Sequence, residues 1–307
     1  MDIFLPEDGA GPYPLVVVVH GGGWISGGRR EACISSMFKI VSQGYAVATV
    51  DYRLAPDGQW PLQVHDVKAA IRFLRAHREK YRLNTERIVL WGNSAGAYLV
   101  QLVAATCRGH QIEDLSMGNP NESCQVDGMI SWYGVSNLAT QDLDMTEICG
   151  HSVHMHGGSM ESPACQMLGC VIEENPERAV EASSIRYIAG DFVPSLIQHG
   201  TGDRLVSYRQ SERLYQKIVE ECGLERATLE LFEGAEHGDA RFKTDENIDR
   251  CIDFLDEIFW PDGRLTPRTP LPEIYLMEGE DAHRDLFEAK GEQDREFQNK
   301  FQFRREK

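Results

Sequence analysis

The sequence predicts an α/β fold, with a mostly parallel central sheet and helices on both of its faces. The first observation is the run LVVVV at residues 15–19, because consecutive β-branched residues favour a buried strand. The second is the alternation of such short apolar runs with stretches of helical periodicity, which is typical of βαβ units. The third is the segment RIVLWGNSAGAYLVQ at residues 87–101, where a strand, a glycine-flanked turn and a helix follow one another.

The elements before residue 87 follow this alternation. A strand at 1–6 and the strand at 15–19 come first, and then a helix over 31–43 ends at Gly44. The strand at 45–50 leads to a second helix, whose apolar positions recur at helical spacing. We expect those positions to face the sheet and the charged side chains between them to face away from it. The apolar positions are Val64, Val67, Ile71 and Leu74, and the charged ones are Asp66, Lys68, Arg72 and Arg75.

The elements after residue 101 continue the pattern with one interruption. Strands are expected at 128–133, 194–199 and 228–232, and amphipathic helices at 208–222 and 247–259. Residues 134–190 break the rhythm, which predicts an insertion over the sheet edge that acts as a lid-like region or pocket wall. Composition changes after Trp260, where prolines and then charges of both signs dominate. The sequence therefore predicts one domain over residues 1–260 and a charged C-terminal extension over 261–307.

Composition argues against several classes of partner. The chain has 307 residues and a formal net charge of −17, which disfavours nucleic-acid binding. No stretch of 18 apolar residues is present, so we expect no membrane span, and the start MDIFLPEDG does not resemble a secretion signal. Eight cysteines occur without a C-x-x-C pair, which fits reduced thiols. We therefore expect a cytoplasmic protein, with a homo-oligomer left open.

The turn GNSAG places Ser94 at the tip between a strand and a helix, which is the setting of a nucleophile. Acyl transfer also needs a base, and an acid that orients the base. Asp203 in HGTGD and His237 in EGAEHG each follow a later expected strand. Because the carboxyl ends of parallel strands meet at one edge of the sheet, Ser94, Asp203 and His237 are predicted to form a catalytic triad.

The run HGGGW after the first buried strand predicts an oxyanion hole. Consecutive glycines let backbone N–H groups approach a reacting carbonyl without obstruction by side chains. We expect Gly22 and Gly23 to donate, together with the N–H of Ala95 directly after the nucleophile. His20 is expected to support the glycine loop through hydrogen bonds to the backbone.

Each role has an alternative reading. Ser94 could be a structural serine in a tight turn, Asp203 only a helix cap, and His237 a surface histidine. Asp191 and Glu236 are rival acids, although Asp191 precedes its strand and Glu236 would have to fold back on its neighbour.

Aromatic residues near the same edge are candidates for substrate contacts. Trp24, Tyr52, Trp132 and Tyr133 follow or end strands there, so that they could line an acyl or sugar pocket. The alternative is that they are core aromatics.

The stretch CGHSVHMH at residues 149–156 is a candidate metal site. Cys149, His151, His154 and His156 could bind a transition metal. No carboxylate completes a hydrolytic metal site there, and the serine machinery needs no metal. We therefore expect neither a metal nor a cofactor.

Five motifs together, HGGGW, VDYRLAP, GNSAG, HGTGD and AEHG, resemble the α/β-hydrolase serine esterases. The chain is most similar to bacterial acetyl and feruloyl esterases with a hormone-sensitive-lipase-like glycine loop, over about residues 1–258. The resemblance implies metal-free ester hydrolysis by Ser94, Asp203 and His237, with Gly22, Gly23 and Ala95 as the oxyanion hole. The sequence departs from this family at Ala97, because the turns that carry the nucleophile in related enzymes often have a second glycine there.

The expected function is hydrolysis of carboxylic esters through an acyl-enzyme, with activity falling below about pH 6 as His237 takes up a proton. The resemblance implies that the substrates are acetyl or feruloyl esters of carbohydrate fragments. Acetyl esters are favoured over esters of long acyl chains because no long apolar segment is present that could form a groove. Formamidase or aminopeptidase chemistry on the same machinery is one alternative. A non-catalytic binding protein on this fold is the other.

Overall fold

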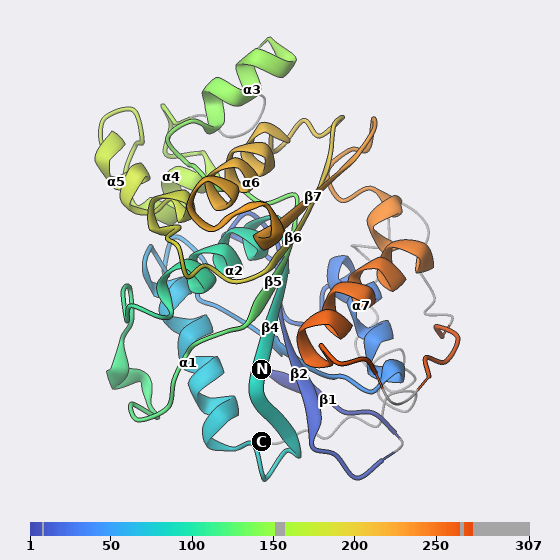
Figure 1. Cartoon of the computed structure of the whole chain (residues 1–307). Helices are drawn as coiled ribbons and strands as arrows, with labels where there is room; N and C mark the ends of the chain where they lie inside the picture. Colours follow the sequence, from blue (N-terminus) through green and yellow to red (C-terminus); the bar gives the residue numbers. More distant parts are fainter. Residues whose placement is uncertain (8, 151–156, 265–266, 273–307) are drawn as a thin grey trace, which may run out of the picture.

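A seven-stranded sheet runs through the middle of the molecule (Figure 1), in a computed structural model that describes residues 1–7, 9–150, 157–264 and 267–272. The strand order is β1-β3-β2-β4-β5-β6-β7, where β1 pairs antiparallel with β3 and every other neighbouring pair is parallel. The strands are β1 (Asp2–Phe4), β2 (Tyr13–Val19), β3 (Ala46–Val50), β4 (Leu83–Asn93), β5 (Gly128–Trp132), β6 (Ser195–Gly200) and β7 (Ala227–Phe232).

Helices cover both faces of this sheet, as the alternation of the sequence predicts. On one face lie α1 (Leu62–Ala76), α2 (Ala95–Thr106) and α6 (Arg209–Cys222), and on the other η1 (Ala32–Gln43) and α7 (Asp245–Phe259), as Figure 1 shows. Successive residues of β2 pack alternately into the two resulting cores, with Val17 in the first and Val18 in the second. Both faces of β2 are therefore buried, which accounts for its unbroken run of valines.

The strand order reverses between β2 and β4. The segment after β2 continues into η1 on one face, whereas β4 continues into α2 on the opposite face. Two loops that leave neighbouring strands in opposite directions form a crevice beyond the carboxyl edge of the sheet. The glycine loop after β2 and the turn at Ser94 after β4 meet at this edge, where Gly21 lies against Ser94.

The segment between β5 and β6 contains only helical elements in its described part. These are α3 (Gln141–Cys149), α4 (Pro163–Leu168), α5 (Pro176–Glu181) and η3 (Ser184–Tyr187). Short 3₁₀ turns elsewhere are η2 (Leu115–Met117), η4 (Leu224–Arg226) and η5 (Ala240–Lys243). This arrangement matches the predicted change of rhythm over residues 134–190.

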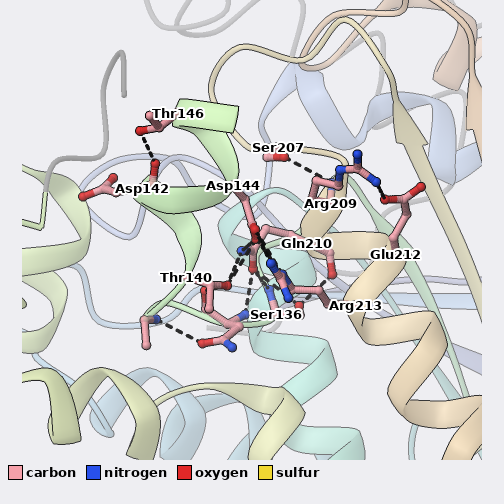
Figure 2. A network of polar contacts seen from close by, with 12 residues as sticks. Ser136, Thr140, Asp142, Asp144, Thr146, Ser207, Arg209, Gln210, Glu212 and Arg213 are labelled. Carbon is pink, nitrogen blue, oxygen red and sulfur yellow. Dashed lines mark hydrogen bonds and ion pairs between the residues drawn. The ribbon is translucent and has the colours of Figure 1, made fainter. Parts of the chain in front are cut away.

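A buried polar network fastens α3 to α6 (Figure 2). The fully buried Asp144 carboxylate accepts hydrogen bonds from the Arg213 guanidinium at 2.6 Å and from Gln210 Nε2 at 2.6 Å. Gln210 Oε1 in turn accepts from the backbone N–H of Ser136 at 3.0 Å and of Asn137 at 2.8 Å. The chain that leaves β5 is thus held against the start of α6, so that the insertion is anchored beside the loop after β6.

The predicted elements agree with the observed ones apart from local detail. Residues 32–43 form a 3₁₀ helix rather than an α-helix, ended by Gly44 in the left-handed region at φ 88°. Beyond α7, the Arg264 guanidinium stacks on the rings of Trp260, at 4.7 Å, and Tyr45, at 5.6 Å. The described start of the predicted extension therefore packs against the end of η1 and against Tyr45, which leads into β3.

Two of the charged residues of α1 that are predicted to face away from the sheet are nevertheless buried. The side chains of Lys68 and Arg72 are fully buried beneath the 107–127 segment. Lys68 Nζ donates to the Thr106 carbonyl at 3.1 Å, and Arg72 forms an ion pair with Glu113 at 2.7 Å. Helical spacing identifies the face that packs on the sheet, but it does not reveal that a long loop covers the opposite face.

Removal of one partner of the buried Arg72–Glu113 ion pair is expected to destabilise the protein more than removal of one partner of an exposed pair. Glu113 has a side chain only 3% exposed, and Glu113→Ala would leave the Arg72 charge buried without its partner. We expect the free energy of unfolding to fall by about 3 kcal/mol in urea denaturation. The exposed pair of Arg78 and Glu122 provides the control, since Glu122→Ala is expected to cost less than about 1 kcal/mol. Equal losses in both variants would contradict this account of the loop.

Candidate active site

The backbone at Ser94 is strained and is held by close packing on both sides. Ser94 has φ 53° and ψ −122°, a region that non-glycine residues rarely adopt. A Cβ added at Gly92 would lie 2.5 Å from the backbone of Gly96, and one added at Gly96 would lie 2.1 Å from the Val19 carbonyl oxygen. The two glycines therefore allow α2 to approach β2 closely enough to leave the serine at the tip of the turn.

Ala97 stands where related nucleophile turns often have glycine, and the structure provides room for its methyl group. A Cβ added at Gly134 would lie 2.6 Å from the Ala97 methyl group. The glycine that follows β5 thus leaves the space that the extra methyl group requires, so that α2 keeps its position behind Ser94.

Three side chains from three loops form a continuous hydrogen-bonded chain. Ser94 Oγ lies 2.9 Å from His237 Nε2, and His237 Nδ1 lies 2.6 Å from Asp203 Oδ2. Ser94 follows β4, Asp203 follows β6 and His237 follows β7, so that all three lie at the carboxyl edge of the sheet. The structure brings together the three residues that the sequence proposes as a triad.

The Asp203 carboxylate is buried and fully engaged. Its Oδ1 accepts from the backbone N–H groups of Leu205 at 2.8 Å and Val206 at 2.9 Å. Its Oδ2 accepts from His237 and lies 3.2 Å from His199 Nε2. Burial disfavours the charged form, but the charge of His237 and the hydrogen bonds from both imidazoles outweigh it and hold the pKa of Asp203 well below its usual range.

The rival acids lie elsewhere. The side chains of Asp191 and Glu236 are exposed, and the hydrogen bond to His237 Nδ1 comes from Asp203. The Asp203 side chain does bond backbone N–H groups as a cap would, through Oδ1, while Oδ2 remains for the imidazoles. Capping and triad geometry therefore coexist in one carboxylate.

The glycine loop lies directly beside the nucleophile. A Cβ added at Gly21 would be 3.2 Å from the Ser94 Cβ. Gly22 adopts φ 111°, and its carbonyl accepts from the N–H groups of Ile25 and Ser26. Ala95 is the first residue of α2, where backbone N–H groups have no partner within the helix and favour negative charge. The glycine loop, at Gly21, and the start of α2, at Ala95, thus lie next to Ser94.

His20 supports this loop from below, as the sequence predicts. Its Nδ1 lies 2.7 Å from the Gly21 carbonyl, and its ring stacks on that of Tyr52 at 4.4 Å. Tyr52 Oη donates to the carbonyls of His20 at 3.1 Å and Gly21 at 3.3 Å. The two side chains therefore fix the path of the glycine loop.

The four aromatic residues proposed as substrate contacts are all buried. Their exposed fractions are 1% for Trp24, 5% for Tyr52, 0% for Trp132 and 1% for Tyr133. Trp24 packs edge-on against Tyr98, and Tyr133 packs edge-on against the ring of His237 at 4.7 Å. Their packing supports the alternative that they are core aromatics, with Tyr52 and Tyr133 holding the glycine loop and His237.

Two residues of the site were missed by the sequence reasoning. His199 lies in the same HGTGD motif as Asp203 and contacts it. Its place at the end of an expected buried strand could have indicated this contact. Pro163 of α4 packs against Gly23, where an added Cβ would lie 3.4 Å from the Pro163 Cβ. No local pattern indicates Pro163, because its contact joins the insertion to a loop 140 positions earlier.

The candidate metal stretch lies largely outside the described residues, since His151, His154 and His156 belong to 151–156. Among the residues that are described, no group of three or more His, Cys, Asp or Glu side chains is placed to hold a metal ion. Within the same part of the chain, no helix combines the length and apolar character needed to cross a bilayer.

Comparison with known proteins agrees with this architecture. The sequence model of the BD-FAE family matches residues 1–218. Esterase LipC of Mycobacterium tuberculosis is 26% identical over 232 residues, which cover 74% of this chain and 53% of LipC. A probable isoprenylcysteine alpha-carbonyl methylesterase of Arabidopsis thaliana, ICMEL1, is 26% identical over 78% of this chain and 48% of its own. The chain thus spans about half the length of these curated relatives.

Among solved structures, a truncated carbohydrate esterase from gut microbiota superimposes with a TM-score of 0.71 at 24% identity. The match covers 83% of this chain and 89% of that one. At this identity the likeness shows the fold, which is that of the α/β hydrolases.

The lowered pKa of Asp203 predicts a pH-dependent contribution to stability. Because its pKa in the folded protein lies below the unfolded value of about 3.9, the ionised carboxylate stabilises the fold above that pH. This stabilisation is lost as the pH falls through the folded-state pKa. In Asp203→Asn the amide N–H₂ would face groups that are all donors, so we expect the variant to be less stable than wild type near about pH 6.

The difference in unfolding free energy between Asp203→Asn and wild type is expected to shrink as the pH is lowered from about 6 to about 3. Urea denaturation across this range measures it. Asp191→Asn, which changes an exposed carboxyl group, serves as the control and is expected to stay close to wild type throughout. A difference that grows on acidification would contradict the assigned direction of the pKa shift.

Proposed function

The chain belongs to the BD-FAE family, and from this premise we propose that it is a serine carboxylesterase that removes short acyl groups from carbohydrate esters. Ser94 is the proposed nucleophile, His237 the general base and acid, and Asp203 the carboxylate that orients His237. The proposed oxyanion donors are the N–H groups of Gly22, Gly23 and Ala95.

The observation that carries the proposal is the unbroken chain from Ser94 Oγ through His237 to Asp203, at 2.9 Å and 2.6 Å. Both distances are within the reach of proton transfer and of a charge-assisted hydrogen bond. The acid is buried behind His237 and the serine is half-buried, so Asp203 can orient His237 while the proton moves between Ser94 and His237 alone. A binding protein on this fold would have no use for such an arrangement, so the geometry favours an enzyme.

The reaction proceeds in two halves. Ser94 Oγ attacks the ester carbonyl carbon while its proton passes to His237 Nε2, and Asp203 stabilises the resulting imidazolium. The tetrahedral intermediate collapses when the C–O bond to the alcohol breaks and His237 returns the proton to the leaving oxygen. Water then attacks the acyl-enzyme with the same proton transfers, releasing the acid and restoring Ser94.

The oxyanion that forms in both halves requires donors already in place. The proposed donors are N–H groups of the glycine loop, where Gly22 has a left-handed backbone, and of the start of α2 at Ala95, where the N–H groups have no partner within the helix. Each donor to an oxyanion contributes about 3 kcal/mol to stabilisation of the transition state. Support of the glycine loop by His20 and Tyr52 keeps these groups from reorganising during the reaction.

The proposed preference for short acyl groups rests on the insertion. Pro163 packs over Gly23, and Ile25, which is 38% exposed, flanks the same glycine. Apolar groups this close to the oxyanion loop restrict the room beside the acyl carbon. A carbohydrate alcohol is supported by the name of one structural neighbour, a carbohydrate esterase from gut microbiota, and by the family resemblance.

Replacement of the nucleophile tests the reaction itself. Ser94→Ala removes the attacking oxygen, so we expect hydrolysis of p-nitrophenyl acetate to fall by about a thousandfold or more. Labelling by a fluorophosphonate probe, followed by mass spectrometry, is expected to modify Ser94 in wild type only.

The matched control is Ser116→Ala, which changes an exposed serine of η2 and is expected to retain wild-type activity and labelling. A Ser94→Ala variant that keeps a tenth of the wild-type rate would overturn the assignment. A p-nitroanilide measured beside the ester separates esterase from amidase chemistry, and equal rates on the two would also contradict the proposal.

Acyl length tests the proposed role of Pro163. On acetyl, butyryl, octanoyl and feruloyl esters, with acetylated xylo-oligosaccharide included, we expect kcat/KM to be highest for acetyl and lower by about tenfold or more for octanoyl. Pro163→Ala opens the space beside Gly23 and is expected to raise the ratio of octanoyl to acetyl activity. If the variant left this ratio unchanged, the insertion would not set acyl length.

A further inference from the structure

The triad acid of this protein holds two imidazoles rather than one. Besides His237, the Asp203 Oδ2 atom lies 3.2 Å from Nε2 of His199, whose side chain is fully buried. The same Nε2 lies 3.0 Å from the Val206 carbonyl oxygen, and the other ring nitrogen, Nδ1, lies 2.7 Å from Ser211 Oγ. His199 has no part in the proposed reaction, and burial separates it from any substrate.

The neighbours of His199 determine where its hydrogen lies. Both partners of Nε2 are acceptors, since one is a carbonyl oxygen and the other is a carboxylate whose pKa is held low. Nε2 therefore carries the hydrogen and shares it between the two oxygens. Ser211 Oγ, which both donates and accepts, satisfies Nδ1.

His199 is also placed to hold the acid rigidly. It lies in β6 opposite Leu231 of β7, whereas Asp203 lies in the turn that follows β6. Ser211 belongs to α6, so the ring is held from a strand and a helix while its Nε2 reaches into the turn. The turn itself holds only Oδ1, through the N–H groups of Leu205 and Val206.

We propose that His199 is a positioning residue, which fixes the Asp203 Oδ2 atom so that this oxygen meets His237 Nδ1 in the orientation needed for turnover. The inference rests on the proposed function, because it assigns His199 a role through the triad. Without the bond from His199, Oδ2 would be held only by His237, and the carboxylate could rotate about the two bonds at Oδ1. Small misplacements of this kind lower turnover while leaving substrate binding nearly unchanged.

The test compares two carboxamides that differ by one methylene group. In His199→Gln the amide nitrogen reaches the position of Nε2, and its two N–H groups match the Asp203 and Val206 oxygens. In His199→Asn the amide reaches only the position of Nδ1, next to Ser211. We expect His199→Gln to keep kcat within about threefold of wild type and His199→Asn to lose about tenfold or more, with KM within about twofold in both.

A control separates positioning from simple packing of α6 on β6. Ser211→Ala removes only the bond at Nδ1 and is expected to keep kcat within about threefold of wild type. Equal losses in His199→Gln and His199→Asn, or a loss in Ser211→Ala as large as that in His199→Asn, would overturn the proposal. Wild-type kcat in His199→Asn would overturn it as well.

A second measurement does not depend on turnover. The proton shared by His237 Nδ1 and Asp203 gives a low-field proton NMR resonance, which we expect to be retained in His199→Gln and shifted or lost in His199→Asn. An unchanged resonance in His199→Asn would contradict the inference. The proposed function is tested by other results: it would be wrong if the wild-type protein hydrolysed no ester or if Ser94→Ala stayed active. Even then, the NMR resonance would still show whether His199 positions Asp203.

Discussion

The close approach of α2 to β2 is the constraint on which the site depends. It exists because Gly96 meets the Val19 carbonyl and Gly92 meets Gly96 at separations that exclude a Cβ. The same approach forces Ser94 into a left-handed backbone, so that its side chain stands at the tip of the turn and the start of α2 lies behind it. The energetic cost of this backbone is balanced by the surrounding core, since α2 is buried along nearly its whole length.

The reversal of strand order between β2 and β4 brings the glycine loop next to the strained turn at Ser94. The glycine loop leaves β2 toward one face and α2 leaves β4 toward the other, and the loop lies against Ser94 where the two part. Later parallel strands add Asp203 after β6 and His237 after β7 at the same edge. A buried carboxylate is tolerated there because donors surround it, and those donors also keep it ionised.

The insertion between β5 and β6 connects the walls of the site to its polar core. At its start, Gln210 of α6 binds the backbone at Ser136 and also the buried Asp144, which ties the insertion to the helix after the acid loop (Figure 2). Further along, Pro163 reaches Gly23 on the oxyanion side. One segment therefore contacts the surroundings of both the acid and the glycine loop.

The sequence by itself determined the sheet, the faces of most helices and the three residues that meet at the carboxyl edge of the sheet. Those features depend on local patterns: runs of β-branched residues, helical spacing, and polar residues directly after strands. Only the tertiary structure decided that Asp203 rather than Asp191 or Glu236 meets His237, that Lys68 and Arg72 lie buried under a loop, and that His199 shares the acid. It also decided that the four aromatic side chains proposed for the pocket are buried. These outcomes depend on contacts between residues far apart in the chain, and no local pattern records which distant partner will cover a side chain.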